Sequence, residues 1–165
     1  MLESMGLVFA LTGMAVAVFV SGIGSSIGLG IASKSATAVL SEKPERYGIL
    51  MLLVVLPSTQ GIYGFVVGLF VMIKLNIFAG FDAVYAVTWA QGLQILAACL
   101  PVAFAGLISA IHQGKTGAAG IMMAAKRPEL AFKAGVVFAA MVELYAILGF
   151  LISLLTLMLG IKVGA

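Results

Sequence analysis

Four long runs with almost no charged residues dominate the chain. They cover residues 4–33, 47–73, 83–111 and 134–161. A helix needs about 20 apolar residues to cross the hydrocarbon core of a bilayer, so each run is long enough to span it. Inside hydrocarbon the backbone must satisfy its own hydrogen bonds, which a helix does within one segment. The pattern therefore predicts an all-α membrane protein with four transmembrane helices.

The composition agrees with this prediction and limits the possible functions. The chain is 63% hydrophobic and 9% charged, whereas soluble domains are about 25% charged. The sequence contains no phosphate-binding loop, nucleophile triad or cluster of metal ligands, so it is not expected to be an enzyme by itself or to bind nucleic acid. Its single cysteine, Cys99, excludes an intramolecular disulfide. Like the lone His112, Cys99 is assigned no chemistry.

The basic residues predict how the helices are oriented in the membrane. Cytoplasmic loops carry an excess of lysine and arginine. Seven of the nine basic residues lie in or beside the loops that join the first run to the second and the third to the fourth: Lys34, Lys43, Arg46, Lys115, Lys126, Arg127 and Lys133. Both loops are therefore expected to face the cytoplasm, and both termini to face outside. Because Glu3 precedes the first run in place of a basic leader, this run is expected to be a retained helix and not a signal peptide.

The two halves of the chain repeat one another. The first part of each half matches at an offset of 84 residues, but further along Gly64 matches Gly149 at an offset of 85. One residue must therefore be inserted between the loop that joins the third run to the fourth (the second inner loop) and the centre of the last run. The repeat predicts two fused helical hairpins of the same orientation, residues 1–80 and 81–165. Before that point the offset is 84, and it pairs Gly22 with Gly106, Ser25 with Ser109, Gly30 with Gly114, Lys43 with Arg127 and Pro44-Glu45 with Pro128-Glu129.

The last run contains one charged residue, Glu143, near its middle. A carboxyl group at that depth costs a few kcal/mol or more, and such residues are usually functional. The offset of 85 places Ser58 opposite Glu143, so the first hairpin lacks the acid. A carboxyl group that only held the bundle together would be expected in both halves or in neither. The asymmetry favours a cation-binding acid over a protonated glutamate that is merely hydrogen-bonded within the bundle.

A polar cluster lies in the middle of the second run. Leu56, Thr59, Gln60 and Tyr63 are spaced i, i+3, i+4 and i+7, which places them on one helical face. Pro57 has no backbone amide to donate, so the helix is predicted to bend there. This face fits either half of an ion site or a set of interhelical hydrogen bonds.

Small residues at every fourth position mark the first and third runs. Gly24 and Gly28 form such a pair in the first run, and Gly106, Ala110 and Gly114 repeat the spacing in the third. In lipid, this spacing allows two helix backbones to approach closely. The first helix is therefore predicted to pack tightly against other helices.

Taken together, these features resemble the rotor-ring subunit (proteolipid, c or K subunit) of V-type ATPases, and in particular its sodium-transporting branch. The resemblance covers nearly the whole chain. It rests on residues 56–64 (LPSTQGIYG), 113–115 (QGK) and 142–149 (VELYAILG). It implies a non-catalytic, ion-translocating subunit that forms a homo-oligomeric ring, with odd-numbered helices on the inner wall and even-numbered helices on the outer wall.

The resemblance also implies one Na⁺ site per chain. The implied role of Tyr63 is to donate a hydrogen bond to the carboxylate. Sodium is a hard cation that prefers oxygen ligands. One carboxylate neutralises one monovalent ion, so an occupied site can face lipid, whereas an ionised empty site cannot. Li⁺ is expected to substitute. The ligands implied are Glu143, Gln113, Thr59, Gln60 and the Leu56 carbonyl, and the hydroxyl of Ser58, where a smaller residue is expected, would add a ligand or hydrogen bond.

Two other functions remain open from the residues alone. A proton-carrying rotor subunit needs only the carboxylate in an apolar pocket, which would leave Thr59, Gln60 and Gln113 as surplus polar groups. A small four-helix cation-coupled antiporter also uses one intramembrane Glu, but in its first helix. The resemblance further implies a bacterial plasma membrane, a stator subunit with a membrane Arg, and central-stalk subunits that dock on the loops near residues 43–46 and 126–127.

Overall fold

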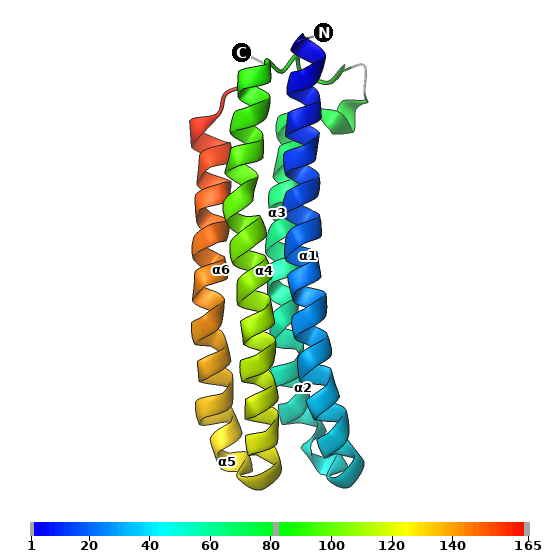
Figure 1. Ribbon diagram of the computed structural model, residues 1–165, viewed down its shortest axis with the longest axis vertical. Coiled ribbons are helices and arrows are strands. Elements are labelled where there is room, and N and C mark those ends of the chain that lie inside the picture. Colours follow the sequence, from blue (N-terminus) through cyan, green and yellow to red (C-terminus); the bar gives the residue numbers. More distant parts are fainter. Residues whose placement is uncertain (1, 81–82, 164–165) are drawn as a thin grey trace.

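Four helical spans run side by side along the molecule (Figure 1). The computed structural model describes residues 2–80 and 83–163, and every regular element in these residues is helical. Each span is long and apolar enough to cross a membrane. The prediction of an all-α membrane protein with four spans is therefore confirmed. The spans are Met5–Glu42, Pro44–Lys74, Trp89–Lys126 and Pro128–Gly160.

Two of the spans are continuous helices and two are interrupted. The first is α1 (Leu2–Glu42) and the third is α4 (Trp89–Lys126). The second contains a 3-10 turn (Pro44–Arg46), α2 (Tyr47–Val55), another 3-10 turn (Leu56–Ser58) and α3 (Thr59–Lys74). The fourth contains α5 (Pro128–Leu130), a π-helical segment (Ala131–Val136), α6 (Val137–Leu155) and a second π-helical segment (Thr156–Gly160). A 3-10 turn (Ile77–Ala79) lies in the connection between the second and third spans, here named the outer connection because it is predicted to face outside.

The helices extend well past the uncharged runs at the end of the bundle that holds the two basic loops, here named the inner end because these loops are predicted to face the cytoplasm. α1 continues to Glu42 and α4 to Lys126, because lysine and glutamate are compatible with a helix. Each helix ends just before a residue that precedes proline, a position that disfavours helical backbone angles. At the outer end α4 starts at Trp89, where Thr88 and Gln91 form a capping box.

Two of these interruptions lie where the sequence indicated. The 3-10 turn at Leu56–Ser58 contains Pro57, where the helix was predicted to bend. The π-helical segment Ala131–Val136 lies between the second inner loop and Glu143. A π-bulge adds one residue to an α-helix. It therefore accounts for the change in the repeat offset from 84 to 85.

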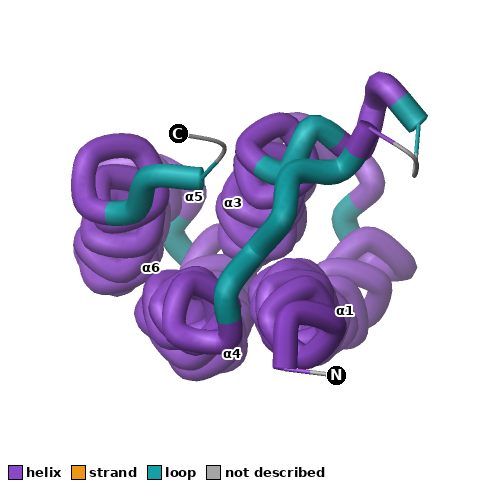
Figure 2. Tube along the Cα trace, turned by 90° about the horizontal axis from the view of Figure 1, so that it is seen from above, coloured by secondary structure: helices purple, strands orange, loops and turns teal. Residues whose placement is uncertain are grey.

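Viewed along the bundle, α1 and α4 lie beside each other, with α3 and α6 on the other side (Figure 2). The most extensive contact is between α1 and α4. A β-carbon added at Gly28 would lie 2.2 Å from the carbonyl oxygen of Ala110, and one added at Gly114 would lie 2.3 Å from that of Gly28. The predicted close approach of small residues is confirmed, because only glycine fits at these two positions.

The two inner loops lie together at one end of the bundle, and the outer connection lies at the opposite end (Figure 1). Each half of the chain is thus a helical hairpin, and both hairpins point the same way. The predicted boundary between residues 1–80 and 81–165 adjoins residues 81–82, which lie outside the described residues, so it stays a prediction.

Candidate ion-binding site

The carboxylate of Glu143 lies where α3, α4 and α6 meet. Tyr63, from α3, donates its hydroxyl proton to Oε1 of Glu143 at 2.6 Å. Gln113, from α4, donates from Nε2 to Oε2 of Glu143 at 3.2 Å. Glu143 is half-buried, and its two oxygens are therefore held by donors from two other helices.

Two fully buried glutamines extend the site inward. Both Gln60 and Gln113 have no exposed surface. Nε2 of Gln60 donates to Oε1 of Gln113 at 2.6 Å, and Nε2 of Gln113 also donates to the Ala139 carbonyl at 3.1 Å. Buried polar groups need partners, and in hydrocarbon only other protein groups can supply them. The pair therefore cross-links α3, α4 and α6 at the level of the acid.

The remaining predicted ligands lie beside the proline-induced turn. The hydroxyl of Thr59 shares its single proton between the Leu56 carbonyl at 2.9 Å and Oε1 of Gln60 at 3.3 Å. The Leu56 carbonyl also accepts the backbone amide of Thr59, which closes the 3-10 turn. All six residues predicted for the site thus belong to one hydrogen-bonded network.

One member of the network was missed by sequence reasoning. The buried hydroxyl of Ser109 donates to the Val142 carbonyl at 2.9 Å and accepts from Nε2 of Gln60 at 3.4 Å. Ser109 lies one helical turn before Gln113, so the spacing placed it on the correct face. Its repeat partner, Ser25, accepts the Gly61 amide at 2.7 Å in the first hairpin. A repeated serine within a small-residue helix was therefore the available signal.

Ser58, opposite the acid in the repeat, bonds locally. Its hydroxyl donates to the Val55 carbonyl in its own span. Of the two repeat-related positions, 58 and 143, the structure therefore connects Glu143 to the network and Ser58 to its own span.

The side chain of Tyr63 is oriented by stacking on Phe150, with ring centroids 5.3 Å apart.

Glu143 is the only charged member of the network. Among the described residues, the ion pairs lie in the inner loops, between Arg46 and Glu45 at 3.7 Å and between Arg127 and Glu129 at 3.8 Å. The same residues contain no group of three His, Cys, Asp or Glu side chains that could hold a metal ion. One negative charge with neutral oxygens around it suits a monovalent cation, because the bound pair is electrically neutral.

Replacing Tyr63 with Phe is expected to weaken cation binding about 10- to 100-fold. The change removes a hydrogen bond to a charged group, worth about 1.5–3 kcal/mol, and leaves the stacking on Phe150 in place. Cation affinity can be measured from protection of Glu143 against carbodiimide. Tyr145→Phe is a matched control because Tyr145 is exposed on the same helix as Glu143. Equal affinities in the two variants would contradict the role of Tyr63.

Comparison with known proteins places these residues in a family. The family model that describes the C subunit of ATP synthase matches the chain twice, over residues 12–71 and 96–156. The offset between the two matches is 84 at their start and 85 at their end, which agrees with the repeat and its inserted residue.

Two curated relatives match over most of the chain. The V-type sodium ATPase subunit K of Enterococcus hirae is 50% identical over 150 residues, which cover 91% of this chain and 90% of the relative. The A-type ATP synthase subunit K of Methanocaldococcus jannaschii is 35% identical over 158 residues, which cover 96% of this chain and 65% of the relative. With the family model matching both hairpins, the chain belongs to the ATP synthase C-subunit family, whose members are non-catalytic, ion-translocating rotor subunits of rotary ATPases.

Proposed function

We propose that this chain carries Na⁺ across the membrane on Glu143 as a ring of identical copies rotates in a V-type ATPase. The observation that carries the proposal is the hydrogen-bonded network that joins one carboxylate to several neutral oxygens. Oxygen ligands suit a hard cation such as sodium. The relative named as a sodium ATPase subunit, with which the chain shares 50% identity, supports the same ion.

Five residues form the proposed coordination shell, and Li⁺ is expected to occupy it as well. Tyr63 supports the shell by fixing the carboxylate. Several of the ligand oxygens accept hydrogen bonds from neighbouring members of the network, and ion binding would exchange these bonds for contacts with the cation. The proposed ligands are Glu143, Gln113, Thr59, Gln60 and the carbonyl oxygen of Leu56.

The charge of Glu143 couples ion binding to rotation. With Na⁺ bound, the site is neutral and can pass through lipid. Without an ion, the carboxylate would expose a bare charge to hydrocarbon, which is strongly unfavourable. Each site therefore turns with its ion bound and exchanges it where water and a stator arginine reach Glu143. ATP hydrolysis belongs to partner subunits, because no nucleotide-binding motif is present in the sequence.

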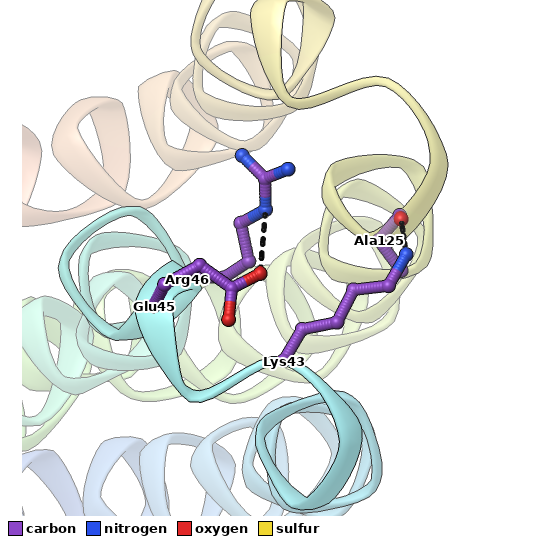
Figure 3. A network of polar contacts seen from close by, with 4 residues as sticks. All are labelled: Lys43, Glu45, Arg46 and Ala125. Atoms are coloured by element: carbon purple, nitrogen blue, oxygen red, sulfur yellow. Dashed lines mark hydrogen bonds and ion pairs between the residues drawn. The ribbon is translucent and has the colours of Figure 1, made fainter.

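The inner loops are the proposed docking site for the central stalk. The second inner loop carries exposed Lys126 and Arg127, whose side chain is 73% exposed, and the first carries the half-buried Lys43 and Arg46 (Figure 3). Cytoplasmic loops of membrane proteins are rich in such residues. We therefore assign this end to the cytoplasm and the termini to the outside of a bacterial plasma membrane.

Proton transport is the main competing function. A proton needs only the carboxylate, and no shell of neutral oxygens. Gln60 and Gln113 are fully buried; Gln113 donates to the acid, and Gln60 donates to Gln113. Buried polar groups in a membrane are costly unless they are used. Their presence favours a metal cation over a proton.

Carbodiimide labelling of assembled rings in membranes tests the proposal. The reagent modifies a protonated carboxyl group, so labelling of Glu143 should fall when Na⁺ is added at fixed pH. Li⁺ should protect and K⁺ should not. A Gln113→Leu variant should keep the labelling and lose the protection, because the acid remains while a neutral ligand is gone. Labelling that depends on pH alone, with no effect of Na⁺, would identify a proton carrier instead.

A further inference from the structure

Ser109 joins three helices at the level of the acid. It lies on α4 and is buried. Its hydroxyl donates to the Val142 carbonyl on α6 at 2.9 Å and accepts from Nε2 of Gln60 on α3 at 3.4 Å. These bonds go to neighbours of the ion site and not to the carboxylate of Glu143. An influence of Ser109 on a bound ion must therefore pass through another residue.

The Val142 carbonyl fixes which way the Ser109 hydroxyl points. A backbone carbonyl can only accept a hydrogen bond, so the single proton of the hydroxyl is used there. The oxygen of Ser109 is then an acceptor toward Gln60. Only the NH₂ group of the Gln60 amide can pair with an acceptor, so this group faces Ser109. The amide oxygen of Gln60 consequently points away from Ser109 and faces Thr59.

A second carbonyl of α6 fixes the other glutamine in the same way. Nε2 of Gln113 donates to the Ala139 carbonyl at 3.1 Å, so Oε1 of Gln113 faces Gln60. If the Gln60 amide turned over, its oxygen would meet this oxygen across a separation of 2.6 Å, and neither has a proton to share. Two backbone carbonyls thus set the direction of the whole network. Ser109 transmits one of them without being a proposed ion ligand.

We propose that Ser109 is a positioning residue for the ion site; this role rests on the proposed function and is exerted through Gln60, whose amide oxygen Ser109 keeps directed at the cation. A cation that draws Oε1 of Gln113 toward itself weakens the bond from Gln60 to that oxygen. Ser109 is then the acceptor that holds the NH₂ group of Gln60 away from the ion. Without Ser109, the amide can turn this positively polarised group toward the cation, which repels it.

The variant Ser109→Ala, studied in assembled rings by carbodiimide labelling, tests this role. It keeps every proposed ligand and removes a hydrogen bond between neutral groups. Half-maximal protection of Glu143 should need about 3- to 10-fold more Na⁺ than in the wild type. Without Na⁺, the pH profile of labelling should match that of the wild type, because Ser109 bonds to Gln60 and Val142 and not to the carboxylate.

Ser153→Ala is the matched control. Ser153 is buried as well, and its hydroxyl also joins α6 to α4, by accepting the backbone amide of Val102 at 3.0 Å. It lies about 15 Å from Glu143 along the helix, at about 1.5 Å per residue. The control loosens the same pair of helices and should leave the Na⁺ requirement unchanged. Equal weakening by the two alanine variants would show that Ser109 acts only through packing, and would overturn the positioning role.

A double variant shows whether Ser109 acts through Gln60. Gln60→Leu removes the amide and should itself weaken protection, because a proposed ligand is lost. Adding Ser109→Ala to that background should change the Na⁺ requirement by less than about 2-fold, since residues that act through one contact are not additive. If Ser109→Ala cost the same in both backgrounds, Ser109 would act apart from Gln60, and the positioning role would be wrong.

The wild type separates this role from the proposed function. If Na⁺ fails to protect the wild type, the sodium proposal fails and the role of Ser109 fails with it. If Na⁺ protects the wild type and protects Ser109→Ala at the same concentration, only the role of Ser109 is overturned.

Discussion

Replacing Glu143 with Gln is expected to abolish ATP-driven ion transport while the subunit still folds and assembles. The amide has the same shape and can still accept a hydrogen bond from Tyr63. It has no charge to neutralise a bound cation, however, and no proton to exchange. Transport into membrane vesicles should fall to background, and ring yield should stay near that of the wild type.

Two controls separate charge from geometry in this experiment. Glu143→Asp keeps the charge but shortens the side chain, so it should retain reduced transport with weaker ion affinity. Thr156→Ala removes an exposed hydroxyl that bonds only to the Ile152 carbonyl of its own span, far from the inner loops. It should behave as wild type. Transport that persists in Glu143→Gln would show that the acid is structural.

Replacing Gly28 with Leu is expected to prevent assembly of the bundle. A β-carbon at this position would lie 2.2 Å from the Ala110 carbonyl oxygen and 2.9 Å from Cβ of Pro57. Neither atom can move without displacing α4 or the proline-induced turn. Overpacking costs about 1–3 kcal/mol or more, and the added branched side chain enlarges the overlap. Little assembled subunit should be recovered from the membrane.

Gly48→Leu is the matched control for this prediction. Nothing lies within 4 Å of a β-carbon built at Gly48. Leucine also favours a helix over glycine by about 1 kcal/mol, so this variant should assemble at least as well as the wild type. If Gly28→Leu gave the same yield as Gly48→Leu, the close approach of α1 and α4 would not be required.

The fold was largely predictable because hydrocarbon imposes few choices. An uncharged run of sufficient length must be a helix, and the prolines repeated in the two inner loops, Pro44 and Pro128, mark the turns of the hairpins. The ends were harder to predict. Hydropathy ends a run at the first charge, whereas the helix itself continues, so α1 extends beyond Lys34 to Glu42. The inserted residue was predicted from the repeat, but its form as a π-helical segment depends on the backbone.

The site was predictable in part. Glu143 is evident as the lone charge in a membrane span, and the helical spacing of Leu56, Thr59, Gln60 and Tyr63 defines one face. Gln113 lies in a polar inner segment, and only the family resemblance singled it out. Ser109 looked like a packing residue because small residues are common at helix contacts in membranes. Which donor meets which acceptor is decided by three helices together, and periodicity within one helix does not contain that information.

Direct binding of radioactive sodium to purified rings tests the central claim most simply. At neutral pH we expect saturable binding of one sodium ion per chain, displaced by Li⁺ but not by K⁺. Binding should disappear in Glu143→Gln and persist in Ser58→Ala, because Ser58 bonds within its own helix. A ring that binds no sodium at any concentration, or binds it equally in Glu143→Gln, would contradict the account.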